Sequence, residues 1–170
     1  MSEELKTVAR VDLARYLGTW YEIARKPMRF EDATARDITA TYALEADGAV
    51  RVTNSCLDAD GEVDVAEGRA EPVDAGNNAK LEVTFLPRGL RWIPFARGDY
   101  WILRLDEGYR TALVGEPGRK YLWLLHREPR MDPAMRGEWL EFARTLGYDL
   151  GDVIFPAQSG QVHREAEAAR

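Results

Sequence analysis

Between Trp20 and Arg127 the chain is a series of short segments with strand character, and each segment ends at a turn. The segments are rich in β-branched and aromatic residues or alternate apolar with polar side chains, and they lie at 38–44, 50–56, 63–72, 81–85, 99–105, 109–115 and 120–127. Short strands at this spacing predict an antiparallel sandwich or barrel. With a strand that starts near Trp20 they number eight, which is enough to close a barrel around one small ligand.

A single long helix is predicted after the strands, over about 132–147. Asp132 can cap its first turn, Pro133 suits the first helical position, and Gly147 can adopt the left-handed conformation that ends a helix. Apolar residues between these ends fall on one face. The segment 152–155 is predicted to form one more short strand.

These elements divide the chain into three parts. We expect an N-terminal extension over 1–11 and one domain over 12–158, whose barrel spans about 19–127. The charged, alanine-rich end at 159–170 is predicted to be a flexible tail.

Composition excludes several classes of protein. The 170 residues carry a net charge of −6, and clustered basic residues, which nucleic acids require, are missing. Cys56 is the only cysteine, so no disulfide can form within the chain. No stretch approaches the ~18 apolar residues of a membrane span, and the first residues lack a signal-peptide pattern. As written, the chain is expected to be cytoplasmic, although a leader removed in processing would leave no trace.

Three sequence blocks resemble the conserved blocks of the lipocalins. Residues 16–25, Tyr-Leu-Gly-Thr-Trp-Tyr-Glu-Ile-Ala-Arg, resemble the first block with its Gly-x-Trp, and 122–127, Leu-Trp-Leu-Leu-His-Arg, resemble the third. Residues 109–114 stand where the second block belongs but lack its usual Thr-Asp-Tyr. The runs Trp-Tyr-Glu, Lys-Leu-Glu-Val and Tyr-Trp-Ile-Leu are most similar to bacterial lipocalins and apolipoprotein D-like members.

The resemblance covers about 12–158 and implies a specific all-β fold. The expected architecture is an eight-stranded antiparallel up-and-down barrel with one C-terminal α-helix packed outside and a short extra strand. Relatives of this kind are often periplasmic or outer-membrane lipoproteins anchored through a cysteine ahead of the barrel, and this sequence has no cysteine before Cys56.

Gly18, Trp20 and Arg127 are predicted to be structural. Gly18 lets the chain turn tightly into the first strand. Trp20 would plug the narrow end of the barrel, where Arg127 can lie across the indole and bond carbonyl oxygens of the N-terminal segment. Such a cation–π contact is worth about 1–2 kcal/mol when it is shielded from water.

The cavity lining follows from the two-residue period of a strand. Trp20 and Arg127 fix the inward face of the first and last strands, which turns Ala24 inward as well, and exterior charges fix it on most others. The pattern leaves the sixth strand open, and there the resemblance places Trp101 and Leu103 inside. In apolipoprotein D-like members, positions matching Tyr42, Asn54, Trp101 and Trp123 line the ligand site. The predicted ligand-binding residues are Glu22, Tyr42, Asn54, Ala70, Val83, Phe85, Trp101, Tyr121, Trp123 and Leu125.

This lining suits an apolar molecule with one polar end, so binding or transport of a fatty acid, lysophospholipid or similar ligand is the predicted function. Two alternatives stay open: a barrel with a filled core, and an enzyme that acts on a lipid through Cys56 or Glu22. Glu22 can either hold a polar network at the cavity floor or contact a ligand head group. Cys56 has no base near it in the sequence, and a small buried hydrophobe is the simpler interpretation. We therefore expect no catalytic residues.

Two further features bear on partners. His126 and His163 are the only histidines and lack ligand-like spacing, so no metal site and no cofactor are expected. The loop at 86–97 is apolar and basic in an otherwise acidic chain. It is predicted either to fold over the barrel mouth as a lid or to make peripheral membrane contact.

Overall fold

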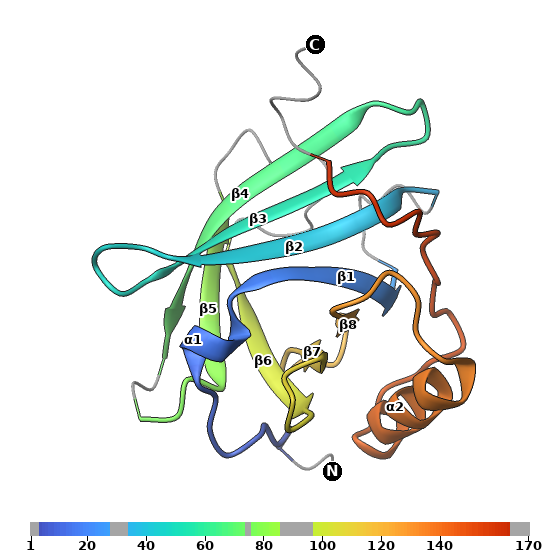
Figure 1. Cartoon of the computed structure of the whole chain (residues 1–170). Coiled ribbons are helices and arrows are strands. Elements are labelled where there is room, and N and C mark those ends of the chain that lie inside the picture. Colours follow the sequence, from blue (N-terminus) through green and yellow to red (C-terminus); the bar gives the residue numbers. More distant parts are fainter. Residues whose placement is uncertain (1–3, 28–33, 74–75, 86–96, 164–170) are drawn as a thin grey trace.

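Eight antiparallel strands close into a barrel in the computed structural model, which describes residues 4–27, 34–73, 76–85 and 97–163 (Figure 1). Each strand pairs with the next along the chain, and β8 pairs with β1 to complete the barrel. The strands are β1 (Gly18–Arg25), β2 (Arg36–Leu44), β3 (Val50–Leu57), β4 (Val63–Pro72), β5 (Lys80–Phe85), β6 (Arg97–Leu105), β7 (Thr111–Gly115) and β8 (Leu122–His126). The predicted up-and-down barrel is confirmed.

The long helix α2 (Pro133–Thr145) lies outside the barrel (Figure 1). Asp132 caps it as expected, because its side chain accepts a hydrogen bond from the amide of Met135. The extra strand is reduced to one antiparallel bridge between Ile154 and Arg25. A short helix that the sequence did not predict, α1 (Leu13–Tyr16), precedes β1. No helix in the described residues has the length and apolar character needed to cross a membrane.

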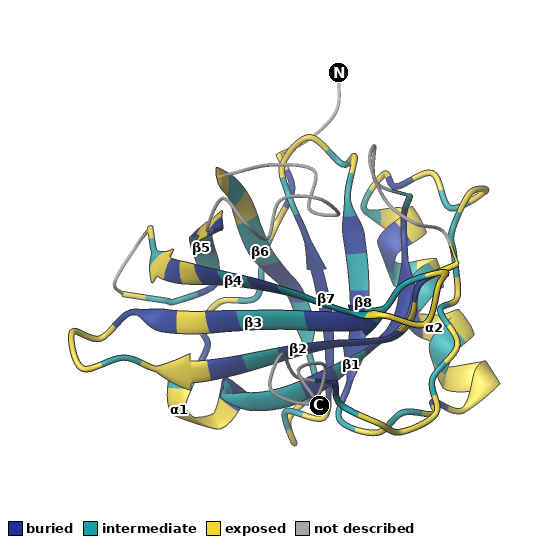
Figure 2. Cartoon of the chain, turned by 90° about the horizontal axis from the view of Figure 1, so that it is seen from above, coloured by how far each residue is buried: buried dark blue, intermediate teal, exposed yellow. Residues whose placement is uncertain are grey.

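Buried apolar side chains form two clusters on opposite sides of the sheet. The inner cluster lies within the barrel and includes Trp20, Tyr42 and Val83. The outer cluster lies between the barrel and α2 and includes Leu113 and Trp139. Strand β7 serves both, because successive side chains point to opposite faces, and all of its residues are buried (Figure 2).

Both terminal segments pack against the barrel. In the N-terminal segment, Leu5 belongs to the outer cluster and the amide of Val8 donates to the carbonyl of Ile102. At the other end, the buried carboxylate of Asp37 on β2 accepts hydrogen bonds from the amide and hydroxyl of Ser159, and His163 Nε2 lies 2.9 Å from it. Residues 159–163, predicted as the start of a flexible tail, therefore pack against β2, and 164–170 lie outside the described residues.

Candidate functional site

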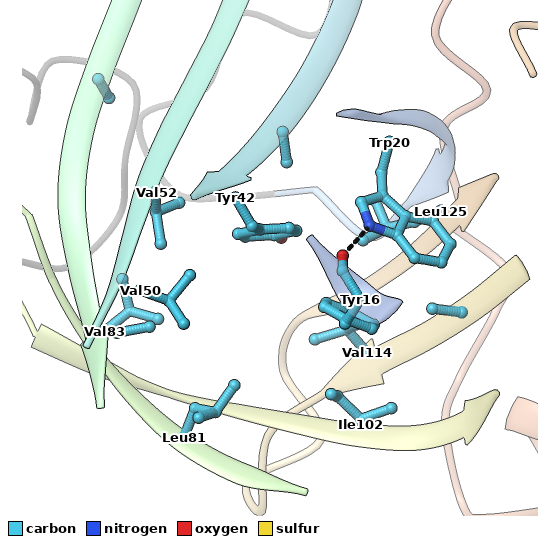
Figure 3. Packing of buried hydrophobic residues seen from close by; sticks show 14 of the residues in the cluster. Tyr16, Trp20, Tyr42, Val50, Val52, Leu81, Val83, Ile102, Val114 and Leu125 are labelled. Atoms are coloured by element: carbon cyan, nitrogen blue, oxygen red, sulfur yellow. Dashed lines mark hydrogen bonds between the residues drawn. The ribbon is translucent and has the colours of Figure 1, made fainter. Parts of the chain in front are cut away.

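One end of the barrel is closed by Trp20, whose indole is fully buried. The Arg127 guanidinium lies over this ring, 3.7 Å from its centroid. The indole nitrogen donates to the carbonyl of Tyr16, which lies beside Trp20 in the packed interior (Figure 3). The structure confirms the predicted stacking of Arg127 on Trp20.

Arg127 also ties this end of the barrel together through its hydrogen bonds. Its guanidinium donates to the backbone carbonyls of Arg15, Thr19 and Tyr109, at 2.9, 3.2 and 3.0 Å. These oxygens belong to α1, β1 and the β6–β7 turn. Trp20 and Arg127 therefore act as a closure of the fold, and we call this region the closed end.

Inside the barrel, above the closed end, lies a cavity of about 60 Å³ within the described residues, which we call the main cavity. Its walls are mostly aliphatic and aromatic, and polar side chains interrupt them at a few positions. The lining residues are Glu22, Ile38, Thr39, Ala40, Tyr42, Val52, Asn54, Val83, Phe85, Asp99, Tyr100, Trp123 and Leu125. A smaller apolar cavity of about 10 Å³ lies next to it, against α1, and shares Tyr42, Val83 and Tyr100 with it.

Most predicted site residues lie on the main cavity wall. They are Glu22, Tyr42, Asn54, Val83, Phe85, Trp123 and Leu125. Ala70 instead lines the smaller cavity. Tyr121 is outside both linings, and its ring stacks on Trp123 with the centroids 6.2 Å apart. The filled-core alternative is not favoured by this geometry, because the interior holds a cavity.

Gly68 on β4 makes room for one of these walls. A Cβ atom at this position would lie 2.8 Å from the Thr84 carbonyl oxygen and 2.9 Å from a ring carbon of Phe85. Glycine therefore leaves room for the Phe85 ring beside β4, where the ring borders the cavity.

The prediction that Trp101 faces the cavity is wrong. Trp101 packs with the outer cluster, and the Lys80 ammonium lies 4.2 Å from its ring centroid. Its neighbours Tyr100 and Ile102 face the interior instead. Leu103, also expected inside, belongs to the outer cluster together with Trp101, because β6 alternates regularly from Tyr100 to Leu103 and the resemblance implied the opposite face. A bulge between Ile102 and Arg104 changes the alternation only beyond this point, where Leu105 packs with the inner cluster.

A second bulge changes the inward face of β1. The register against β8 shifts between Glu22 and Ala24, so Ile23 and Ala24 both join the outer cluster. Ala24 was expected inside, and this expectation is wrong. Arg25 is buried beside Glu22, and its Nε lies 3.5 Å from a carboxylate oxygen of Glu22. Strict alternation would have turned Arg25 outward, so the sequence pattern missed this buried ion pair.

Three tyrosine hydroxyls meet between the two cavities. The hydroxyl of Tyr100 lies 2.7 Å from that of Tyr16 and 2.7 Å from that of Tyr42. Burial raises the pKa of all three phenols above the ordinary value, so they stay protonated at neutral pH. Tyr16 and Tyr100 were missed, because α1 was not predicted and because apolar residues on both faces of β6 left its inward face open.

Cys56 is buried in the inner cluster. Burial, together with the nearby carboxylates of Asp64 and Glu22, raises the pKa of its thiol to about 12. The thiol is therefore almost fully protonated at neutral pH, and a protonated thiol is a poor nucleophile.

Other predicted features give no site within the described residues. No group of three or more His, Cys, Asp or Glu side chains there is placed to hold a metal ion. The loop predicted as a lid or membrane contact, 86–97, lies outside the described residues except for Arg97, the first residue of β6.

Known proteins are similar to this chain in sequence or in architecture. A family model described as a lipocalin-like domain matches residues 11–158. The chain is 38% identical over 159 residues to temperature-induced lipocalin-1 of Arabidopsis thaliana, covering 92% of this chain and 84% of that protein. It is 40% identical over 154 residues to outer membrane lipoprotein Blc of Escherichia coli K12, covering 90% and 82%. With apolipoprotein D of Bos taurus the identity is 36% over 128 residues, covering 72% and 64%.

Among solved structures, insecticyanin from the tobacco hornworm Manduca sexta has the same barrel. The TM-score is 0.68 at 18% sequence identity, and the match covers 98% of this chain and 88% of insecticyanin. This likeness concerns the fold alone. The sequence relatives include outer membrane lipoproteins, and they give no support to the cytoplasmic location expected from the sequence.

Proposed function

This chain belongs to the lipocalin family, and we propose that it binds and carries a small hydrophobic or amphiphilic molecule, such as a fatty acid or lysophospholipid, in the main cavity. Lipocalins generally bind and transport small hydrophobic ligands. The observation that carries the proposal is the cavity itself: Val52, Val83, Phe85, Trp123 and Leu125 border it with apolar surface.

The charges around the cavity favour a ligand whose head group stays near water. The described lining contains the carboxylates of Glu22 and Asp99 but no lysine or arginine. An anionic head group would be repelled there, whereas an acyl chain would replace water on the apolar walls. The small volume holds only part of a long chain. We therefore place the chain inside and the head group toward the open end, where β8 begins at Leu122.

The enzyme alternative gains no support from the groups that would carry it. Cys56 is held in its protonated form, and Glu22 is paired with Arg25. We accordingly propose a binding protein without catalytic residues.

Two tryptophans provide a matched test of the proposed site. Trp123 and Trp101 are both half-buried, but Trp123 borders the main cavity and Trp101 packs on the outside of the barrel. Trp123→Ala should weaken binding of a fluorescent fatty acid by about tenfold, which equals about 1.4 kcal/mol. Trp101→Ala should leave binding unchanged, and the melting temperature of Trp123→Ala should stay close to that of the wild type.

Fluorescence titration at neutral pH, with thermal unfolding of each variant, measures both quantities. Equal affinity of wild type and Trp123→Ala would exclude the main cavity as the site for this ligand. Equal losses in both variants would point to a general change in the barrel and would also count against the proposal.

A further inference from the structure

We propose that the inner end of the main cavity is a subsite for a neutral oxygen acceptor, such as a ketone or ester carbonyl, with the donor supplied by the tyrosine cluster. The tyrosine cluster consists of Tyr16, Tyr42 and Tyr100. This inference rests on the proposed function, because it assumes that the ligand occupies the main cavity. It adds the chemistry that the ligand must carry at its buried end.

The tyrosine cluster lies at the boundary between the cavity and the closed end. Tyr16 packs on Trp20 with ring centroids 4.9 Å apart, and Tyr42 packs on Tyr16 at 5.5 Å. Figure 3 shows Tyr16 and Tyr42 close together beside Trp20. Tyr42 and Tyr100 border the main cavity, whereas Tyr16 borders only the smaller one. A ligand that fills the main cavity to its inner end therefore meets Tyr42 and Tyr100.

A count of hydrogen-bond donors shows that one hydroxyl proton of the cluster is available to a ligand. Each phenol hydroxyl can donate one hydrogen bond and accept two. The three hydroxyls form a chain with Tyr100 in the middle, so the two contacts of 2.7 Å use two of the three protons. No other acceptor among the described residues takes the third proton. The chain therefore has one donor for a molecule in the cavity.

Burial makes this donor valuable to a ligand. Tyr16 and Tyr42 are 3% and 6% exposed. A buried donor without an acceptor is destabilising, because it has lost its hydrogen bond to water and gained none in return. Because burial keeps all three phenols protonated, the donor persists at neutral pH. A purely hydrocarbon ligand would leave it unsatisfied, whereas an oxygen acceptor would satisfy it.

The surrounding charges favour a neutral acceptor over a carboxylate. Glu22 borders the same cavity and acts on Tyr42 as a negative charge. Arg127 acts on Tyr42 as a positive charge, but its guanidinium lies over Trp20 and donates to backbone oxygens. Arg25 is paired with Glu22. An anionic oxygen at the inner end would meet a carboxylate without a cation of its own. A ketone, ester or hydroxyl oxygen avoids this repulsion.

Three nine-carbon probes separate these possibilities: 2-nonanone, nonane and nonanoate. Their affinities are measured by displacement of a fluorescent fatty acid from the wild type and from Tyr42→Phe/Tyr100→Phe. The double variant keeps the rings but removes both hydroxyls that border the cavity. It should bind 2-nonanone about threefold to tenfold more weakly, the usual range for one neutral hydrogen bond. Nonane, which leaves the donor unsatisfied, should bind the double variant at least as tightly as the wild type, and nonanoate should bind both proteins equally. Tyr21→Phe, which removes a hydroxyl on the outside of β1, should change nothing.

Infrared spectroscopy of carbonyl-labelled 2-nonanone bound to the wild type provides a measurement that depends on no variant. The carbonyl band should lie at the lower frequency of a hydrogen-bonded ketone and return to the free position in the double variant. A free carbonyl band in the wild type, or unchanged ketone affinity in the double variant, would overturn the subsite. A matching loss of nonanoate affinity would overturn the preference for a neutral oxygen.

If no probe displaces the fatty acid and the fatty acid itself does not bind, the proposed function fails as well. Binding of nonane without any ketone preference would leave the proposed function standing and refute only the subsite.

Discussion

The closed end of the barrel and the wall of the main cavity hold their buried polar groups in different ways. At the closed end, Arg127 bonds backbone oxygens from three separate segments and stacks on Trp20. In the cavity wall, side chains bond one another, as in the Glu22–Arg25 ion pair and the tyrosine cluster. The contacts at the closed end therefore depend on the course of the backbone. The contacts in the cavity wall depend on which side chains point into the barrel.

Because of this difference, we expect the closed end to be rigid and the cavity wall to be adaptable. Backbone acceptors cannot move without moving whole elements, so the closed end has one arrangement. Side-chain pairs in the cavity wall can exchange partners when a ligand enters, because only rotamers need to change. We therefore expect substitutions at the closed end to act on stability alone, and substitutions in the cavity wall to act on ligand binding, on stability through the buried charges, or on both.

The largest effect is expected from Trp20→Ala. Removing a fully buried indole leaves a cavity and also removes the surface on which Arg127 lies. The free energy of unfolding should fall by about 3–5 kcal/mol. Urea denaturation followed by circular dichroism measures this loss. A loss below about 1 kcal/mol, typical of a mild surface change, would show that Trp20 does not hold the closed end together.

A somewhat smaller loss is expected when one partner of the cavity-wall ion pair is removed. Arg25→Met leaves the buried Glu22 carboxylate without this partner and should cost about 3 kcal/mol. Adding Glu22→Gln to the same protein should restore most of the loss, because the remaining polar group is neutral. Urea denaturation of both single variants and the double variant gives the coupling energy. Additive losses would mean that the two side chains do not stabilise each other.

The same contrast explains how far the sequence could predict this molecule. The closed end was predictable, because Gly18, Trp20 and Arg127 stand in recognisable blocks and their contacts are to backbone. Strand order and the caps of α2 were predictable for similar local reasons. The cavity lining was predictable only where strands alternate regularly and the sequence pattern fixes the inward face. On β1 a bulge shifts the register, so Arg25 lies on the face opposite to the one that alternation predicts. On β6 the pattern left the inward face open, and Trp101 lies on the face opposite to the one that the resemblance implied.

The C-terminal contacts were unpredictable for another reason. Asp37 is 120 residues or more from its partners in the chain, and nothing in the local sequence of 157–163 marks a segment that packs on β2. Only the closed barrel brings Asp37, Ser159 and His163 together. Gln158 adds to this seam by donating to the carbonyls of Glu22 and Ile38, on the two strands that border it.

Asp37→Asn tests this seam and should cost about 2 kcal/mol, within the range for hydrogen bonds to a charged group. Burial alone would raise the pKa of Asp37, but hydrogen bonds from His163 and Ser159 outweigh it and hold the pKa below its ordinary value of 3.8. A lowered pKa stabilises the fold above about pH 4, and this contribution is lost as the pH falls through the folded-state pKa. The wild type should therefore lose its advantage over Asp37→Asn below pH 4. A stability difference that stays constant from pH 7 to pH 3 would contradict the assignment.

The smallest expected effect uses one substitution at two glycines. Gly18 opens β1 at the closed end with a φ of 101°, and an added Cβ would lie 3.2 Å from Arg127 Nη1. Gly18→Ala should therefore destabilise the protein by about 1 kcal/mol, since alanine is strained in this conformation.

Gly137→Ala is the matched control, because a Cβ there meets nothing within 4 Å and the residue lies inside α2. It should stabilise the protein by up to about 1 kcal/mol through helix propensity. Opposite shifts in the urea midpoint would support a backbone strain specific to Gly18. A stabilising shift at both glycines would show that the closed end does not require glycine at position 18.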